Sequence, residues 1–312
     1  MGINTLIYYF FRGLIVALLS IVVILLIALT SYAPDAYVFI NELRYYENKS
    51  LGIDSITGNV FFFDLVREIF RFFNVSDLVD YFFGVLIVYL FVFYLKYLHF
   101  LSQVNLKDLL LIFAASLITY DINSVRFSFA IILFLYSFSD KLSPLWRYFL
   151  RFLSFLSHIL PFIVYYSARF YYFPLFLLPT IVIALNQIDS RFYFYFVQEE
   201  FKFFKVFLLL IPNLMSTYFY KKGEIKNKIA EFAIAFNILF FVFIIFNGAL
   251  AARFLEASFV LFVIWWVFSK ERSSFLGLVL WAFSISMLVS RLISGINAGA
   301  QSAFLFSPTD LF

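Results

Sequence analysis

Two ionisable side chains that stand inside long apolar runs are the first candidates for chemistry in this sequence. Arg126 begins the run VRFSFAIILFLY, and His158 lies in LSHILPF further along the chain. Ionisable groups in apolar surroundings are costly, and by default they face a cavity or one another. A guanidinium can donate two parallel hydrogen bonds to a phosphate, and an imidazole can take a proton from a hydroxyl group.

A second group of polar residues flanks the apolar runs. The group comprises Asp35 in SYAPDAY, the residues Arg67, Glu68 and Arg71 in FFFDLVREIFRFF, and Arg253 in NGALAARFLEA. Each also has a purely structural interpretation: an arginine at a helix end can reach the membrane interface, and a charged stripe can simply be a solvated helix face. Taken together, they are typical of a site with several guanidiniums, one imidazole and carboxylates, which suits a phosphate or diphosphate ligand.

Residues that are missing from the sequence narrow the chemistry further. The chain has no cysteine and only two histidines, which excludes thiolate metal sites and disfavours a multi-histidine metal centre. It contains no phosphate-binding GxxxxGK[ST] loop, no GxSxG elbow and no HExxH motif. We therefore expect no metal and no cofactor. The substrate itself would have to be activated, and a lipid-linked diphosphate carries its own leaving group.

The elements that position these residues are predicted to be membrane-spanning helices. Of the 312 residues, 64% are hydrophobic and 13% are charged, whereas soluble domains are about 45–50% apolar and about 25% charged. The composition therefore predicts an all-α polytopic integral membrane protein that forms a single transmembrane domain over residues 1–312. About ten candidate spans follow from runs long enough to cross the bilayer: 11–31, 81–101, 108–123, 126–140, 146–168, 171–187, 203–220, 229–247, 254–269 and 274–294.

Charge in the short loops predicts the orientation of these spans. The densest basic clusters, at 140–151, 221–228 and 269–273, should all be cytoplasmic. A simple count of spans puts the first two clusters on opposite sides of the membrane. The conflict disappears if residues 146–168 enter the membrane, break near His158 and Pro161, and return as a re-entrant hairpin. Arg126, Arg253 and the loop 32–80 are then external.

The external loop 32–80 is predicted to carry an amphipathic helix over residues 61–73. The charged residues Asp64, Arg67, Glu68 and Arg71 recur at helical spacing and should form its polar face. The opposite face is predicted to be apolar, and it comprises Phe61, Phe62, Leu65, Ile69, Phe72 and Phe73. Such a helix is expected to lie in the membrane interface.

The order of these motifs resembles the EpsG-type, Wzy-like polymerases of bacterial surface polysaccharides. YAPD with Asp35 is similar to the family's Tyr-Pro-x-Asp region, and REIFRFF with Glu68 resembles its Glu-Pro-x-Phe element, with Ile69 in place of the proline. SVRFSFAIILFLYSFSDK resembles an Arg-x-x-x-Ala span that ends in a lysine-bearing loop. LSHILPF and AARFLEASF follow where the family has its histidine and a late arginine element.

The resemblance implies a glycosyltransferase of the bacterial inner membrane with its active site facing the periplasm. Such an enzyme moves a growing glycan from undecaprenyl diphosphate onto the non-reducing end of a lipid-linked repeat unit, without a metal. Its partners would be the lipid-linked donor and acceptor, membrane lipid and a chain-length regulator protein, with no nucleic acid. The implied catalytic residues are His158, Arg126, Asp35 and Glu68, and the implied diphosphate ligands are Arg126, Arg253, Arg67 and Arg71.

Two other functions fit the same composition. A flippase for lipid-linked oligosaccharide would share the arginine and aromatic content, although such transporters usually have internally related halves, and no repeat is evident here. A serotype-type glycosyl modifier would use a similar external cavity with a monosaccharide donor. A membrane acyltransferase would need a histidine near the start of a span and a cytosolic acyl donor, and neither His99 nor His158 fits that pattern well.

Overall fold

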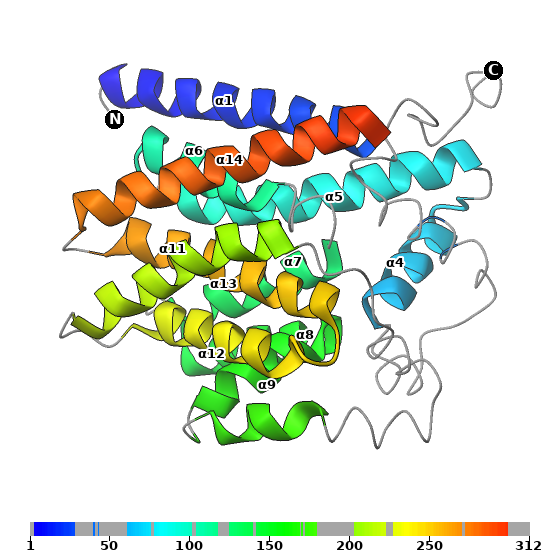
Figure 1. The fold of residues 1–312 in the computed structure, drawn as a ribbon. Helices are drawn as coiled ribbons and strands as arrows, with labels where there is room; N and C mark the ends of the chain where they lie inside the picture. The colour runs from blue at the N-terminus through cyan, green and yellow to red at the C-terminus, as the bar shows by residue number, and fades with distance from the viewer. Residues whose placement is uncertain are drawn as a thin grey trace. The chain divides into compact units, whose positions relative to one another are not determined.

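The computed structural model describes most of the chain as helices (Figure 1). It describes residues 3–28, 61–75, 78–101, 104–117, 125–139, 142–168, 172–179, 203–222, 227–269 and 272–298, with isolated positions 40, 43 and 170. All regular secondary structure within these ranges is helical, and no strand occurs in them. The prediction of an all-α fold is therefore confirmed.

The helices follow the predicted apolar runs closely. Their bounds are α1 (Ile3–Ala28), α4 (Phe61–Phe72), α5 (Leu78–Leu101), α6 (Leu106–Ser116), α7 (Val125–Tyr136), α8 (Pro144–Ser157), α9 (Ile159–Ala168), α11 (Phe203–Lys222), α12 (Lys228–Phe243), α13 (Gly248–Phe268) and α14 (Ser274–Ala298). Residues 173–179 are also helical. The predicted helix of the external loop is therefore present as α4.

The helices form two compact units. The first comprises Met1–Ile159 and Met287–Phe312, and the second comprises Leu160–Ser286. In the first unit, α5 packs against α1, α6 and α7, while α8 packs against α7 and α4. In the second unit, α12 and α13 pack along each other, and α11 contacts both. The single domain over 1–312 stays a prediction.

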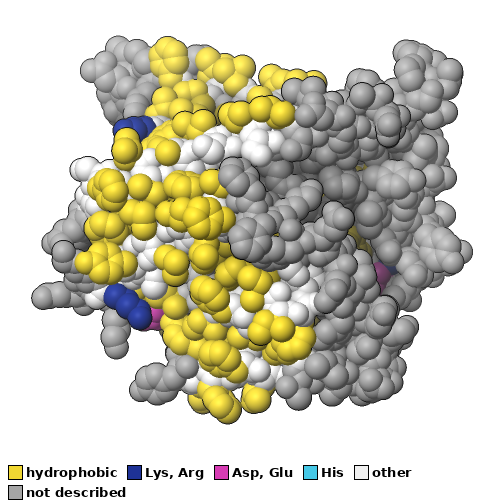
Figure 2. Space-filling model, in the orientation of Figure 1, with side chains coloured by type: hydrophobic (Ala, Val, Ile, Leu, Met, Phe, Trp, Pro, Cys, Tyr) yellow, Lys and Arg dark blue, Asp and Glu magenta, His cyan; other side chains and the backbone are white. Residues whose placement is uncertain are grey.

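Several helices carry apolar side chains on their exposed faces as well as on their buried faces. On α5, Tyr89 and Phe93 are fully buried, whereas Ile87 is 65% exposed. The outward face of α1 is apolar too, since Phe11, Leu14, Leu18, Ile21 and Leu25 are all exposed. Figure 2 shows apolar side chains over much of the described surface on the face in view. Large exposed apolar surfaces of this kind mark contact with a membrane or a partner.

Length and composition single out one helix that could cross a membrane. Among the described residues this is Leu250–Phe268 of α13, most of which is buried. Shorter apolar helices cover Gly13–Leu25, Val125–Tyr136 and Ser274–Ser290. The arrangement of about ten spans therefore stays a prediction.

The helix expected over residues 146–168 is interrupted at His158. α8 ends at Ser157, and the backbone of His158 is extended, with φ −161° and ψ 119°. Pro161 is the third residue of α9, a position whose backbone N–H has no partner within its own helix, so a proline is tolerated there. The predicted break near His158 is confirmed. The return of the chain to the same side of the membrane stays a prediction.

Candidate functional site

Hydrogen bonds of serine hydroxyl groups join the antiparallel helices α7 and α8 at two levels. Ser154 Oγ donates to the carbonyl oxygen of Ala130 at 2.8 Å, and Arg151 Nε donates to Ser137 Oγ at 3.2 Å. Ala130 and Ser154 are fully buried, so the two backbones approach closely. This register puts the N-terminal end of α7, where Arg126 lies, beside the C-terminal end of α8, where His158 lies.

Arg126 and His158 are brought together at this end of the helix pair. The ring of Phe127 meets the imidazole of His158 edge-on, with the centroids 5.1 Å apart and the planes at 73°. The charge of Arg126 acts electrostatically on that imidazole. Both side chains are half-buried. The two residues therefore lie close together, as expected. Their catalytic roles stay a prediction.

α4 supplies an aromatic wall to the same place. The guanidinium of Arg126 lies over the ring of Phe63, 4.9 Å from its centroid, which is cation–π geometry. One residue earlier, Phe62 contacts Phe129 of α7 with the ring centroids 5.4 Å apart. The N-terminal turn of α4 is thus held against the N-terminal turn of α7.

The other half of α4 is seated on α5. The ring of Phe70 lies over Gly84 and packs 5.6 Å from the ring of Tyr81, measured between centroids. A Cβ at position 84 would overlap the Phe70 ring. Gly84 therefore makes room for this contact, and α4 is fixed at both ends.

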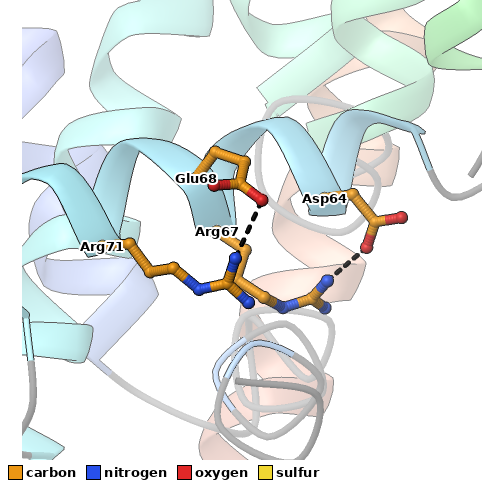
Figure 3. A network of polar contacts seen from close by, with 4 residues as sticks. All are labelled: Asp64, Arg67, Glu68 and Arg71. Carbon is orange, nitrogen blue, oxygen red and sulfur yellow. Dashed lines mark hydrogen bonds and ion pairs between the residues drawn. The ribbon is translucent and has the colours of Figure 1, made fainter. Parts of the chain in front are cut away.

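Two ion pairs run along α4, each joining residues one turn apart (Figure 3). Asp64 pairs with Arg67, and both side chains are buried. Glu68 Oε1 lies 2.9 Å from Arg71 Nη1, and both of these side chains are about one third exposed. The first pair is shielded from solvent, so its two charges depend on each other. The second pair lies at the edge of the protein.

The prediction that the charged face of this helix is solvated is wrong for its first pair. Asp64 is 1% exposed and Arg67 is 2% exposed, whereas Ile69 is 47% exposed and Phe72 is 81% exposed. Leu65 and Phe73 are exposed as well. The two charges compensate each other and can be buried. Phe62, which was predicted on the apolar face, is buried as well. An apolar outer face over a charged inner face is the arrangement that a lipid surrounding favours.

Asp64 is a site residue that sequence reasoning missed. Its Oδ1 pairs with Arg67, and its Oδ2 is buried with no hydrogen-bond donor among the described residues. A carboxylate oxygen in that state is an acceptor ready for a hydroxyl group or a water molecule. The spacing of Asp64 and Arg67, three residues apart on a predicted helix, was the available signal.

The remaining predicted residues lie elsewhere. Asp35 falls outside the described residues. Arg253 belongs to α13 in the second unit, where its side chain is exposed and Glu256, one turn on, is buried. The described cluster of the first unit therefore comprises His158 and Arg126, with Phe63 of α4 against the guanidinium, and the two ion pairs lie further along α4. Among the described residues, no three histidine, cysteine or acidic side chains gather in a group that could hold a metal ion.

Comparisons with protein families, with curated proteins and with solved structures find no match to this chain. Its function is therefore argued from the chemistry of the cluster. Arg126 and Arg71 could bind an anion, and the imidazole of His158 and the free oxygen of Asp64 could accept a proton or a hydrogen bond.

Proposed function

We propose that this protein is a polysaccharide repeat-unit polymerase, a multi-pass glycosyltransferase of the bacterial inner membrane with its active site on the periplasmic side. The substrate class is a glycan linked to undecaprenyl diphosphate, which the chain's resemblance to EpsG-type, Wzy-like polymerases suggests. No metal enters the proposed reaction. A chain-length regulator is the expected protein partner.

One observation carries this proposal: Arg126 and His158 meet at one end of the α7–α8 pair, next to α4. The contacts are those of Phe127 with the imidazole and of Phe63 with the guanidinium. A cation that binds a diphosphate beside a base that accepts a proton is the minimum for glycosyl transfer from a lipid diphosphate.

The proposed reaction uses each group for one task. The acceptor hydroxyl oxygen attacks the anomeric carbon of the donor glycan, and the bond from that carbon to the diphosphate oxygen breaks. The hydroxyl proton passes to His158 or to a carboxylate, for which Glu68 and Asp35 are the alternatives that the family resemblance suggests. Undecaprenyl diphosphate leaves with the bonding electron pair, and Arg126 stabilises its charge. The roles of Arg67, Arg71 and Arg253 as further diphosphate ligands rest on the family resemblance alone.

The decisive experiment replaces Arg126 with Ala in a strain that depends on this protein for its surface polysaccharide. We expect normal protein levels in the membrane and single repeat units in place of the ladder of longer chains on a polysaccharide gel. Arg126→Lys keeps the charge but loses the bidentate fork, so it should leave a short ladder. The control is Arg147→Ala, since Arg147 lies near the opposite end of α8 and binds the carbonyl oxygen of Leu142.

Two results would contradict this function. A ladder of normal length in the Arg126→Ala strain would show that Arg126 is not needed for polymerisation. Repeat units that accumulate on the cytoplasmic side in a deletion strain would identify a flippase, and a lost side branch at unchanged chain length would identify a glycosyl modifier.

A further inference from the structure

A line of polar side chains runs along the buried side of α11 in the second unit. Asn213 and Ser216 have no exposed surface, and Thr217 and Tyr220 follow at the next helical positions. Asn237 of α12, which is 7% exposed, faces Thr217. We call these five residues the polar seam. It lies among α11, α12 and α13, whose other buried residues are mostly apolar.

Hydrogen bonds fix the orientation of the Asn213 amide. Its Nδ2 donates to two backbone carbonyl oxygens, that of Leu209 at 2.9 Å and that of Leu255 at 3.1 Å. Only the NH₂ group can face two carbonyl oxygens, because a carbonyl has no proton to donate. The Oδ1 atom of Asn213 therefore points away from both of them.

The orientation of Asn237 is fixed in the same way. Thr217 Oγ1 donates its proton to the backbone carbonyl oxygen of Asn213 at 2.9 Å. With that proton committed, the Thr217 hydroxyl can only accept, and Asn237 Nδ2 donates to it at 3.4 Å. The Oδ1 atom of Asn237 is therefore also directed away from its partner in the seam.

Three buried oxygen atoms of the seam are left with no hydrogen-bond partner among the described residues. They are Asn213 Oδ1, Ser216 Oγ and Asn237 Oδ1. An unsatisfied buried acceptor costs about 1–3 kcal/mol, and buried polar groups in native proteins are paired in roughly 90% of cases or more. Each of these three atoms can therefore accept a hydrogen bond that the described residues do not supply.

The seam reaches the surface at one end. Tyr220 Oη accepts a hydrogen bond from the backbone N–H of Asn227 at 3.3 Å and lies 3.5 Å from Glu231 Oε1, and both side chains are half-buried. Lys221 and Lys228, next to them in sequence, are exposed. Seven residues of helix, or about 10 Å, separate this polar end from Asn213.

We propose that the polar seam is a hydrated inlet, in which water enters at Tyr220 and Glu231 and donates hydrogen bonds to the three unpaired oxygens. The class of ligand is a small hydrogen-bond donor, and water is the smallest. The seam offers the three unpaired oxygens and the hydroxyl of Tyr220 as polar partners, and an internal water needs two to four such partners. The inlet belongs to the second unit alone and does not rest on the proposed polymerase function.

The absence of cysteine in the sequence makes single-cysteine labelling the direct test. Ser216→Cys and Asn237→Cys probe the seam. Leu214→Cys on α11 and Phe241→Cys on α12 are the controls. The native side chains at these positions are 49% and 51% exposed, on the outer apolar faces of the same two helices. Lys221→Cys marks the accessible end. A charged methanethiosulfonate reagent is applied to permeabilised membranes that carry the full chain.

We expect the seam cysteines at 216 and 237 to react at least ~10-fold faster than the control cysteines at 214 and 241. A thiol ionises in a hydrated seam, whereas it stays protonated at an outer face that lipid covers. No reaction at either seam position, with Lys221→Cys labelled, would overturn the inlet. Fast reaction at 214 and 241 together with 216 and 237 would still support the inlet. It would contradict the proposed function, which places the outer faces of these helices against lipid.

The unmodified protein provides a second measurement if a seam variant does not accumulate. X-ray radiolysis makes hydroxyl radicals from bound water, which oxidise the nearest side chains. Leu255 and Leu261 both lie on α13 with no exposed surface, and a hydrogen bond joins the carbonyl oxygen of Leu255 to Asn213 of the seam. Leu255 should be oxidised several-fold faster, and equal rates would overturn the inlet.

Discussion

The carboxylate of Asp64 and the guanidinium of Arg67 are buried together under α4, so each charge depends on the other for its stability. Taking a single ion out of water costs several kcal/mol, and a paired partner offsets most of that cost. The outer pair, Glu68 with Arg71, remains about one third exposed and interacts through a more polar surrounding. The two ion pairs have the same spacing of three residues along α4, but we expect the buried pair to contribute more to the stability of the fold.

Replacing Asp64 with Ala should lower the free energy of unfolding by about 3–5 kcal/mol, because the charge of Arg67 stays buried without its carboxylate. Glu68→Ala should cost only about 0–1 kcal/mol. The double variant Asp64→Leu with Arg67→Met removes both charges and should be more stable than Asp64→Ala alone. Thermal unfolding in lipid nanodiscs measures all three. Equal losses for Asp64→Ala and Glu68→Ala would show that burial of the first pair is unimportant.

At the scale of elements, α4 is held by the two aromatic residues Phe62 and Phe70. Phe62 joins it to α7, and Phe70 fits over Gly84 of α5. The Phe63 ring faces Arg126. The contact of Phe70 with Gly84 therefore also helps to position this ring relative to the guanidinium. A change on α5 should therefore affect both stability and the candidate site on α7.

Gly84→Ala places a methyl group where the Phe70 ring lies, and overpacking of this kind costs about 1–3 kcal/mol. Adding Phe70→Leu should recover part of that loss, although Phe70→Leu alone is destabilising. Gly13→Ala is the matched control, since nothing lies within 4 Å of a Cβ there, and it should be neutral or slightly stabilising. Additive losses in the double variant would contradict the seating of Phe70 on Gly84, and thermal unfolding decides between the outcomes.

Sequence patterns predict elements well because hydrophobic runs reflect the solvent around them. The apolar run predicted to span at residues 81–101 lies within α5, and the helix predicted at 61–73 from the spacing of its charges is α4. Periodicity shows which residues of α4 share a face, but not which medium each face meets. For that reason the positions of Asp64 and Arg67 were predicted on the wrong side.

The meeting of Arg126 with His158 could be anticipated only through topology. It required a break at His158, and a proline three residues later was the signal for it. The hydroxyl contacts that set the α7–α8 register, such as Ser154 with Ala130, have no signature in one sequence. The unpaired oxygen of Asp64 has none either, because it depends on what surrounds α4.

At the scale of the whole molecule, the direction of the chain after His158 decides on which side each later segment lies. The predicted re-entrant hairpin keeps the basic clusters at 140–151 and 221–228 on one side of the membrane. The confirmed break at His158 is one requirement of that hairpin.

Labelling of a single cysteine at position 169 tests the hairpin directly. Arg169 lies outside the described residues, and the hairpin predicts that Arg169→Cys reacts with a membrane-impermeant maleimide only after the cytoplasmic side is opened. Ser50→Cys, in the loop 32–80 that is predicted to be external, should react in intact cells and serves as the control. Reaction of Arg169→Cys in intact cells would mean that residues 146–168 cross the membrane once.

The orientation of α4 also has a practical consequence for any study of the external loop as an excised fragment. Within the protein, the helix turns Asp64 inward and Phe72 outward. A synthetic peptide of residues 61–73 in water has no bundle to receive the charges, so it would present them to solvent and bury its phenyl rings by self-association. Antibodies raised against that peptide, or ligands selected on it, would bind the face that the intact protein conceals.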